Sequence, residues 1–531
     1  MKKILFNAKI YVDEGQFQEA ILIENDRIVA LGNNDEILEM EHDQALDCQG
    51  KTLIPGINDA HVHLMMISEL STHLQLLGSK SLEDILQKGK NFIAENPGLD
   101  LLYGMGWNYA DFTEGEKRNL TRKDLDKISK EIPVIFTRAC GHMISCNSKA
   151  LELAGINKDS PQVPGGLFDV DEEGPTGCFY ENANSLIDVL RPPFGKDKLK
   201  SAMKDTMNQL LSQGVTTVHS NDCGLSMDPA EFFDFFDDFY PEKSPYPRVH
   251  HQMCFSTPEE FDHYATEKLK TSPASEKRTW GPLKLFKDGS LGGHSALVKE
   301  AYLDNEKNFG VDVLPMEKAR PFIDVAKRHG IQVLTHTIGD LAMEETMEVY
   351  APAEAKDRWG LVHCQITDEE MIEKIAEKDF LAIIQPIFLR SDIEALKGAI
   401  SEDLQRTSYA WKSMLNKGVR IAMSTDSPVE AFNPFENIYC SMERKDLLGN
   451  PSEGFQMQEV LTLEEALDGY TLGSAYAEFR EGEKGRLKPG YLADMILLDR
   501  DIFEIEAKEI METKVLMTMV GGEVLYERKD N

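Results

Sequence analysis

The sequence predicts an α/β protein built on a (β/α)8 barrel, and three observations support this. Apolar or β-rich runs of the length of a buried parallel strand recur eight times between residues 57 and 426. Amphipathic, helix-like segments separate several of these runs. Further β-rich segments stand at both ends of the chain. Eight strand and helix units in succession are typical of a (β/α)8 barrel, and the two ends indicate an additional β domain.

The first 55 residues contain three short strand candidates, KILFNAKIYV, AILIEN and RIVALGN, separated by turn-forming residues. The last 50 residues show the same pattern, with ADMILLDR and VLMTMVGGEVLYER after a joint rich in Gly and Pro at 485–490. Because chain ends of compact proteins often lie close together, we expect both ends to pair into one small sheet domain.

The eight barrel-strand candidates are, in chain order, INDAHVHL (57–64), GVTTVHS (214–220), RVHHQMCF (248–255), PLKLFKDG (282–289), IQVLTH (331–336), GLVHC (360–364), FLAIIQP (380–386) and VRIAMSTD (419–426). Crossover helices are expected at 316–330 and at 402–418, the second ending in a C-cap glycine. The gap between the first two strands is too long for one helix, so it predicts an inserted subdomain with LLYGMGW, VIFTRACGH and NSKALELAG as its own elements.

Composition and charge narrow the function. The 531 residues include 57 Lys+Arg and 91 Asp+Glu, a formal net charge of −34, and 41% are hydrophobic. So acidic a surface repels nucleic acid, but it leaves open a cationic or neutral small molecule, or a metal. No run of about 18 uncharged apolar residues is present, and the amino-terminal start lacks a secretory pattern. We therefore predict a cytoplasmic protein with a small-molecule substrate and no membrane span, and leave assembly into a homo-oligomer open.

The cysteines do not indicate a disulfide framework. There are eight, at positions 48, 140, 146, 178, 223, 254, 364 and 440, and no two form a CxxC pair. Scattered cysteines of this kind are typical of reduced, buried thiols rather than a thiolate zinc site.

His61 and His63 are the strongest local signal for chemistry. Residues two apart on a strand project to the same side, so both imidazoles can face one ion, although HxH is short enough to occur by chance. Lys284 lies in the fourth strand candidate, and His336, His363 and Asp426 lie at the ends of the fifth, sixth and eighth. Each has a plain alternative: a hydrogen-bonded core histidine, a buried ion-pair partner or a helix N-cap. Together they would converge at the carboxyl-terminal mouth of a barrel, where active sites form.

At this point the chain resembles a known family. PGINDAHVH resembles the PG-x-x-D-x-H-x-H signature of the amidohydrolase superfamily, and LKLFKDGSLGG, THTIGD, VHCQ and STDSP are similar to later motifs of its amidohydrolase-3 branch. That branch includes N-substituted formamide deformylases and relatives named as exoenzyme regulatory proteins. The resemblance runs the whole length, down to GRLKPGYLADMILLD. It implies a distorted barrel at 56–479, an inserted subdomain at about 75–205, and a composite β-sandwich from 1–55 and 480–531.

The resemblance also implies a centre of two divalent ions. His61 and His63 would bind the more buried ion with Asp426, and His336 and His363 the more exposed one. Lys284 would be carbamylated by carbon dioxide and bridge both, because a free ammonium cannot ligate a cation; Lys287 is the fallback. This ligand set suits zinc first, with iron or manganese as alternatives. The implied reaction is hydrolysis of an amide-like, non-peptide C–N bond by metal-activated hydroxide, with Asp426 accepting the proton of water.

Substrate contacts are less sharply indicated. His142, in RACGHMISCNSKAL, resembles a family histidine that reaches the site and could polarise the carbonyl, with a surface position as its alternative. Trp107 could form an apolar wall, although core packing is the commoner role of tryptophan. His219 could line the pocket or be structural, and His294 stands where relatives often carry arginine. Asp59 is expected beside the ligands rather than among them.

Two other functions remain open. A mononuclear deaminase on the same fold would use His61, His63, His336 and Asp426, with His363 as base. That reaction usually needs a glutamate just after the fifth-strand histidine, and this sequence has Asp340 four residues on. A non-catalytic regulatory or binding protein would show ligand loss, whereas all six positions are filled.

Overall fold

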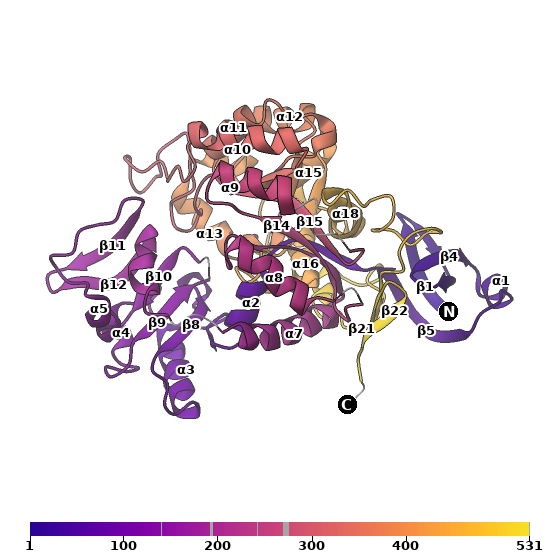
Figure 1. Ribbon diagram of the computed structural model, residues 1–531, viewed down its shortest axis with the longest axis horizontal. Helices are drawn as coiled ribbons and strands as arrows, with labels where there is room; N and C mark the ends of the chain where they lie inside the picture. The colour runs from indigo at the N-terminus through magenta and orange to yellow at the C-terminus, as the bar shows by residue number, and fades with distance from the viewer. Residues whose placement is uncertain (140, 192–194, 242, 269–274, 530–531) are drawn as a thin grey trace.

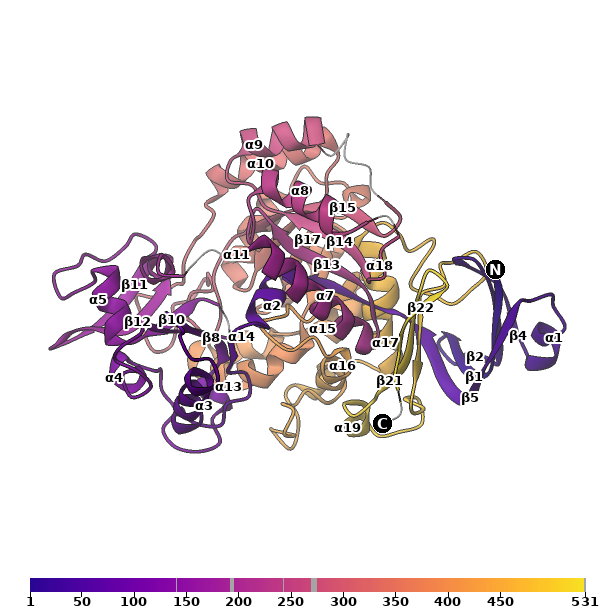
Figure 2. The ribbon, with the colours of Figure 1, turned by 60° about the horizontal axis from the view of Figure 1, so that its bottom comes forward.

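Three β sheets organise the chain, with a parallel barrel between the two other sheets (Figures 1 and 2). The computed structural model describes residues 1–139, 141–191, 195–241, 243–268 and 275–529. Cys140 lies outside the described residues, and the other seven cysteines are free. No helix of the described chain is long and apolar enough to cross a bilayer.

The central sheet contains eight strands, and every neighbouring pair is parallel. The strands are, in order around the sheet, β6 (Ile57–Val62), β13 (Val215–Cys223), β14 (Arg248–Met253), β15 (Arg278–Phe286), β16 (Val333–Thr337), β17 (Gly360–His363), β18 (Leu381–Ile384) and β19 (Ile421–Met423). The edge strands β6 and β19 approach each other at the mouth, where the Asp426 N–H donates to the His61 carbonyl (2.9 Å). The predicted α/β barrel is therefore confirmed, with each strand candidate overlapping one observed strand.

Helices lie around the outside of this sheet (Figure 1). They include α2 (Leu64–Leu70), α7 (Lys196–Ser212), α8 (Pro229–Phe239), α9 (Pro258–His263), α10 (Met316–His329), α11 (Asp340–Val349), α12 (Glu369–Glu377), α13 (Leu389–Ala399), α16 (Pro434–Glu443), α17 (Leu463–Asp468) and α18 (Ser474–Ala477). Helix α8 buries all five of its phenylalanines in the main core. Helix α10 covers the segment predicted at 316–330, and its C-cap is Gly330, whose left-handed φ of 66° suits a residue without a Cβ.

The helix expected at 402–418 was predicted wrongly. The structure has two short helices there, α14 (Glu402–Thr407) and α15 (Trp411–Asn416), separated by Tyr409 with a φ of 55°. Tyr409 is 1% exposed, and its hydroxyl donates to Asp392 on α13. Burial of this side chain turns the backbone out of the helical region, which local helix propensity does not reveal.

Strands from both ends of the chain form one hydrogen-bonded sheet. It contains β1 (Lys2–Asp13), β2 (Gln16–Gln18), β3 (Ala20–Glu24), β4 (Arg27–Gly32), β5 (Gln44–Pro55), β20 (Met495–Leu498), β21 (Val515–Val520) and β22 (Glu523–Glu527), with α1 (Asn34–Leu38) and α19 (Ala507–Ile510) beside it. Strand β5 is the junction, since it pairs with β1 on one side and β20 on the other. Arg248 at the start of β14 binds Asp494 with two hydrogen bonds (2.7 and 3.1 Å) and ties this sheet to the barrel.

The segment inserted between β6 and β13 carries the third sheet. Its elements are β7 (Leu74–Gln75), β8 (Leu102–Trp107), β9 (Val134–Arg138), β10 (Met143–Cys146), β11 (Gly166–Asp171) and β12 (Gly174–Glu181), with α3 (Leu82–Glu95), α4 (Arg122–Leu125), α5 (Ser148–Ala154) and α6 (Ser185–Asp188). The short helix η1 (Tyr109–Asp111) follows β8 and contacts α13 of the barrel. The carboxyl ends of β8 and β9 therefore point toward the barrel.

Candidate active site

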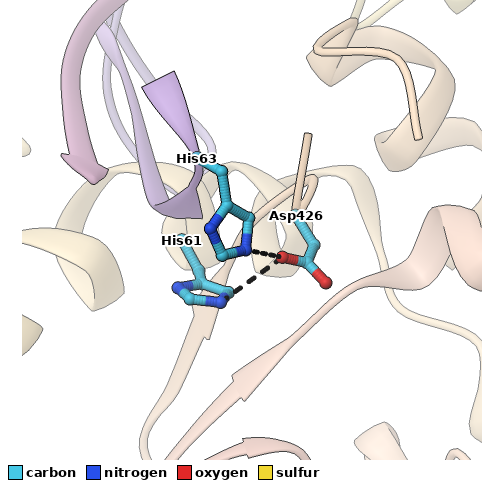
Figure 3. A group of neighbouring side chains, drawn as sticks. All are labelled: His61, His63 and Asp426. Atoms are coloured by element: carbon cyan, nitrogen blue, oxygen red, sulfur yellow. Dashed lines mark ion pairs between the residues drawn. The ribbon is translucent and has the colours of Figure 1, made fainter. Parts of the chain in front are cut away.

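Three predicted ligands meet at the carboxyl-terminal mouth of the barrel (Figure 3). His61 Nε2 lies 3.3 Å and His63 Nε2 lies 3.2 Å from Asp426 Oδ1. One ligand atom from each residue falls within 4.8 Å of the others, and all three side chains are buried. Asp426 reaches this position with a left-handed φ of 55°, a strained conformation of the kind found at functional sites. Two imidazole nitrogens and a carboxylate oxygen form a ligand set for a divalent cation.

His336 and His363 form a second pair next to the first. Their ring centroids are 4.4 Å apart, and the His363 ring lies 6.1 Å from that of His61. His336 is the second-last residue of β16, and His363 is the last residue of β17. The φ of His363, 84°, departs from the strand conformation. Four imidazoles therefore lie together at the mouth of the barrel. They come from β6, from the residue just after β6, from β16 and from β17.

Each of the four histidines has its Nδ1 atom fixed by a neighbour. The partners are the Gln252 side-chain oxygen for His61 (2.7 Å), the Asn221 carbonyl for His63 (3.0 Å), Asp288 Oδ1 for His336 (3.0 Å) and the Gln385 side-chain oxygen for His363 (2.7 Å). Because these partners accept, each Nδ1 carries the hydrogen and each Nε2 keeps a free lone pair. This arrangement orients histidines as metal ligands and raises their basicity.

Lys284 lies among these side chains without a hydrogen-bond partner among the described residues, and its Nζ is 4.1 Å from the centroid of the Phe286 ring. It is 1% exposed, and within the described chain its Nζ has no hydrogen-bond acceptor. Burial lowers the Lys284 pKa to about 8. Burial and the nearby Lys284 ammonium together hold the pKa values of His61 and His336 well below 6.5. A buried amine whose neutral form is accessible near neutral pH is suited to react with carbon dioxide.

Lys287 occupies a different environment. Its Nζ donates to Asp312 (2.6 Å) and to the Leu314 carbonyl (3.1 Å), and it forms an ion pair with Glu345 on α11 (2.5 Å). Lys287 thus faces the outer helices, and Lys284 is the lysine that lies with the histidines.

Asp426 and Asp59 play different parts. Burial alone would raise the Asp426 pKa, but the adjacent His63 side chain and the charges of His363 and Lys284 together outweigh burial and lower the pKa. Asp59 accepts hydrogen bonds from the Thr425 amide (3.1 Å) and hydroxyl (2.6 Å), and burial raises its pKa to about 7. Asp59 therefore fixes the residue that precedes Asp426 in the chain.

His142 comes to the mouth from the inserted segment. Its Nδ1 is 2.9 Å from Glu181 Oε2, and Ser295 of the barrel donates to Glu181 Oε1 (2.8 Å). After burial and Lys284, His142 is a further cause of the lowered His336 pKa, so the two rings are electrostatic neighbours. A position within electrostatic reach of a ligand histidine is consistent with contact to a bound substrate.

The other three residues predicted to contact substrate are packed against or paired with other side chains of the protein. Trp107 is fully buried in the core of the inserted segment, a position that favours packing over substrate binding. His219 is mid-strand, because β13 continues to Cys223, and its Nε2 lies 3.6 Å from Glu478 inside the barrel. His294 stacks on Tyr302 (4.7 Å) and pairs with Asp304 (3.0 Å).

Asp340, which the deaminase alternative would need as an acid, begins α11 and accepts from the backbone amides of Lys299 and Leu341 (3.0 Å each). Gln252, Gln385 and Asp288, which fix the histidines, were not predicted from the sequence. All three stand at or just beyond the ends of apolar strand runs, the same signal that identified the ligands. The Asn221 contact uses a backbone carbonyl, which leaves no trace in residue type.

Comparisons with known proteins agree with this geometry. Residues 44–526 match the model of the amidohydrolase family. The Bacillus subtilis (strain 168) protein YtcJ, which carries an amidohydrolase name, is 31% identical over 99% of this chain and 100% of its own length. An N-substituted formamide deformylase of Arthrobacter pascens is 25% identical over 96% of this chain and 95% of its own.

Among solved structures, an uncharacterized metal-dependent hydrolase from Pyrococcus horikoshii superposes with a TM-score of 0.75 at 24% identity, over 96% of this chain and 99% of that one, which shows a shared fold. The family match covers nearly the whole chain and includes the His61, His63 and Asp426 cluster. This chain therefore belongs to the amidohydrolase family, a group of metal-dependent hydrolases.

Proposed function

We propose that this protein hydrolyses an amide-like, non-peptide C–N bond of a small molecule, using two divalent ions bridged by a carbamate on Lys284. The observation that carries the proposal is the unpartnered Lys284 amine among four histidines whose Nε2 atoms remain available. An unpaired buried polar group is costly, so it is retained where a ligand or modification completes it.

The residues fit the two ions differently. His61, His63 and Asp426 supply three ligand atoms by themselves. His336 and His363 lack a third His, Cys, Asp or Glu ligand within the described chain, because His61, His63 and Asp426 form the one such group there. A carbamate oxygen from Lys284 would complete the second set as well as join the two. Nitrogen and oxygen ligands of this kind suit zinc, with iron or manganese as alternatives.

When bound, the ions would lower the pKa of water and polarise a substrate carbonyl. Asp426 accepts the proton of the attacking water and returns it to the leaving nitrogen in this proposal. Its lowered pKa supports that role, because the carboxylate is ionised at neutral pH. His142, an electrostatic neighbour of His336, holds or polarises the substrate carbonyl in this proposal. The seven described cysteines are free, which supports a reducing compartment such as the cytoplasm.

Metal analysis of protein prepared with zinc and bicarbonate tests the centre. We expect about two ions per chain in the wild type and a sharp fall in Lys284→Ala. Lys287→Ala is the matched control, because it removes the neighbouring lysine and should keep both ions provided circular dichroism shows it folded. One ion per chain that is unaffected by Lys284→Ala would reject the bridged centre and favour the mononuclear alternative.

The reaction is tested separately by its products. A panel of formamides, N-acyl amino acids and cyclic amides is incubated with the metal-loaded protein, and amine, carboxylate and ammonia are quantified. Release of an amine together with a carboxylate supports amide hydrolysis. Ammonia as the sole nitrogen product indicates a deaminase, and failure of the loaded protein to turn over any member supports the regulatory alternative.

A further inference from the structure

Arg138 is a buried cation at the junction between the inserted segment and the barrel. It ends β9 and is 8% exposed. Its Nη2 donates to Asn108 Oδ1 (3.0 Å), and its guanidinium lies 4.7 Å from the ring centroid of Tyr109. Its Nε atom is buried and has no acceptor, and among the described residues no carboxylate forms an ion pair with Arg138. Asn108 and Tyr109 thus hold a guanidinium that no carboxylate of the described residues contacts directly.

The guanidinium faces the loops of the barrel mouth. An ideal Cβ on Gly292 would lie 4.0 Å from Arg138 Nη2. Gly292 belongs to the loop that follows β15, and the same loop contains Asp288, the residue that fixes His336. Arg138 is therefore next to a loop that also supports a predicted metal ligand.

The electrostatic environment of α13 also places Arg138 on this side of the barrel, since η1, which carries Tyr109, contacts that helix. Burial raises the pKa of Asp392 on α13, and Arg138 is one of the groups near enough to oppose that increase. The Asp392 carboxylate is already bound by the Tyr409 hydroxyl and the Gln365 amide. Gln365 follows His363 by two residues, so Arg138 lies between the loops after β15 and β17.

A buried guanidinium that no anion contacts directly is unfavourable unless a bound group supplies that contact. The planar fork of arginine matches a carboxylate in a two-bond arrangement. The chain as a whole carries a net charge of −34, so a cation beside the site is a local exception to a repulsive surface. The positive charge of Arg138 would therefore favour binding of an anionic group at this position.

We propose that Arg138 is a specificity-determining residue that binds a carboxylate of the substrate. This inference rests on the proposed function and narrows it: the substrate class is amides that carry a free carboxylate near the scissile bond. In the reaction, the carbonyl carbon gains the oxygen of water and the C–N bond breaks. The nitrogen takes up the proton that Asp426 removed from water and leaves as an amine. The substrate's own carboxylate is unchanged.

Matched substrate pairs test the inference. N-formyl and N-acetyl derivatives of glycine, alanine, leucine and phenylalanine, in both enantiomers where they exist, are each compared with the corresponding carboxamide on the zinc- and bicarbonate-loaded protein. We expect Arg138→Gln to lower kcat/KM for the carboxylates by about 10- to 100-fold, mainly through KM, because a charge-assisted hydrogen bond is lost. Rates for the carboxamides should change by less than about twofold. An equal loss on both members of each pair would overturn the proposal.

A binding measurement separates this inference from the proposed function. Calorimetric titration of the loaded protein with the same compounds reports binding whether or not turnover occurs. Carboxylate binding that disappears in Arg138→Gln supports the inference even if no compound is hydrolysed, in which case the proposed hydrolysis alone fails. The matched control is Arg118→Gln, which removes an arginine of the same inserted segment that is already paired with Asp124. Carboxylates that bind equally to wild type, Arg138→Gln and Arg118→Gln, or bind to none of them, reject the inference.

Discussion

Two buried polar clusters lie inside the barrel, and they differ in how their charges are paired. The basal cluster, formed by Asn58, Thr217, His219, Glu478 and Lys484, lies toward the amino-terminal ends of the strands. There Lys484 forms an ion pair with Glu478 and donates to Thr217 (2.8 Å), and Asn58 donates to Glu478 (2.8 Å). At the mouth, by contrast, the Nζ of Lys284 has no hydrogen-bond partner within the described chain.

The difference between the two clusters distinguishes buried charges that stabilise the fold from buried charges that bind a ligand. Both lysines are buried and both have lowered pKa values, so burial alone does not distinguish them. Lys484 has a carboxylate partner that repays part of its desolvation, whereas Lys284 has none. We therefore assign stability to the basal cluster and ligand binding to the mouth.

The largest expected effect is at the mouth. Asp426→Asn should reduce turnover of the amide hydrolysed best in the panel by about 100- to 10,000-fold, because the proton acceptor and a ligand oxygen are lost. The free energy of unfolding of the metal-free protein should change by less than about 1 kcal/mol. Exposed Asp159→Asn is the control. A large loss of stability with little loss of turnover would reverse the assignment of the two clusters.

The basal cluster should respond in the opposite way. Glu478→Gln leaves Lys484 buried without a counter-charge, and we expect a loss of about 3–5 kcal/mol of unfolding free energy in urea denaturation of the metal-free protein. The double variant Glu478→Leu/Lys484→Met should recover much of this loss, because no buried charge remains. A single-variant cost below about 1 kcal/mol would contradict a structural role.

A smaller effect is expected from residues that contact the predicted metal ligands but not the ion itself. Gln385→Ala removes the acceptor that orients His363, and zinc affinity measured by chelator competition should fall by about 10- to 100-fold. Gln405→Ala, on the helix α14 away from the histidines, is the comparison variant. Unchanged affinity in Gln385→Ala would show that the ring is held by its strand alone.

The smallest effect concerns acid stability. Burial alone would raise the Asp494 pKa, but the charge and hydrogen bonds of Arg248 lower it below the ordinary value of 3.8. A carboxyl with a depressed folded-state pKa stabilises the fold above its unfolded pKa and loses that contribution as the pH falls. Unfolding free energy should therefore decline below about pH 4, and the decline should be shallower in Asp494→Asn. A steeper decline in the variant would exclude this ion pair as its source.

The fold and the ligands could be predicted because strand signals are local. Runs of apolar residues marked all eight barrel strands, and His61, His336, His363 and Asp426 stood at their ends. The errors arose where tertiary contacts decide. Burial of Tyr409 divides a predicted helix, and the position of His219 depends on how far β13 continues.

The inserted segment was the least predictable part of the site. Arg138 approaches a loop about 150 residues further along the chain, and no residue pattern near position 138 reports that approach. Trp107 and His142 lie on the same segment, yet one packs in its core and the other reaches the mouth. Residue type alone does not distinguish the two.

The cluster of His61, His63 and Asp426 also spans the seam where the first and last strands of the barrel meet. An ion held there is a crosslink between β6 and the end of β19, positions more than 360 residues apart. Metal binding and closure of the sheet into a ring are then thermodynamically coupled, because an ion that binds the closed form stabilises that form. Amide protons along this seam should exchange with solvent more slowly in loaded protein, while those of the sheet formed by the chain ends should not respond.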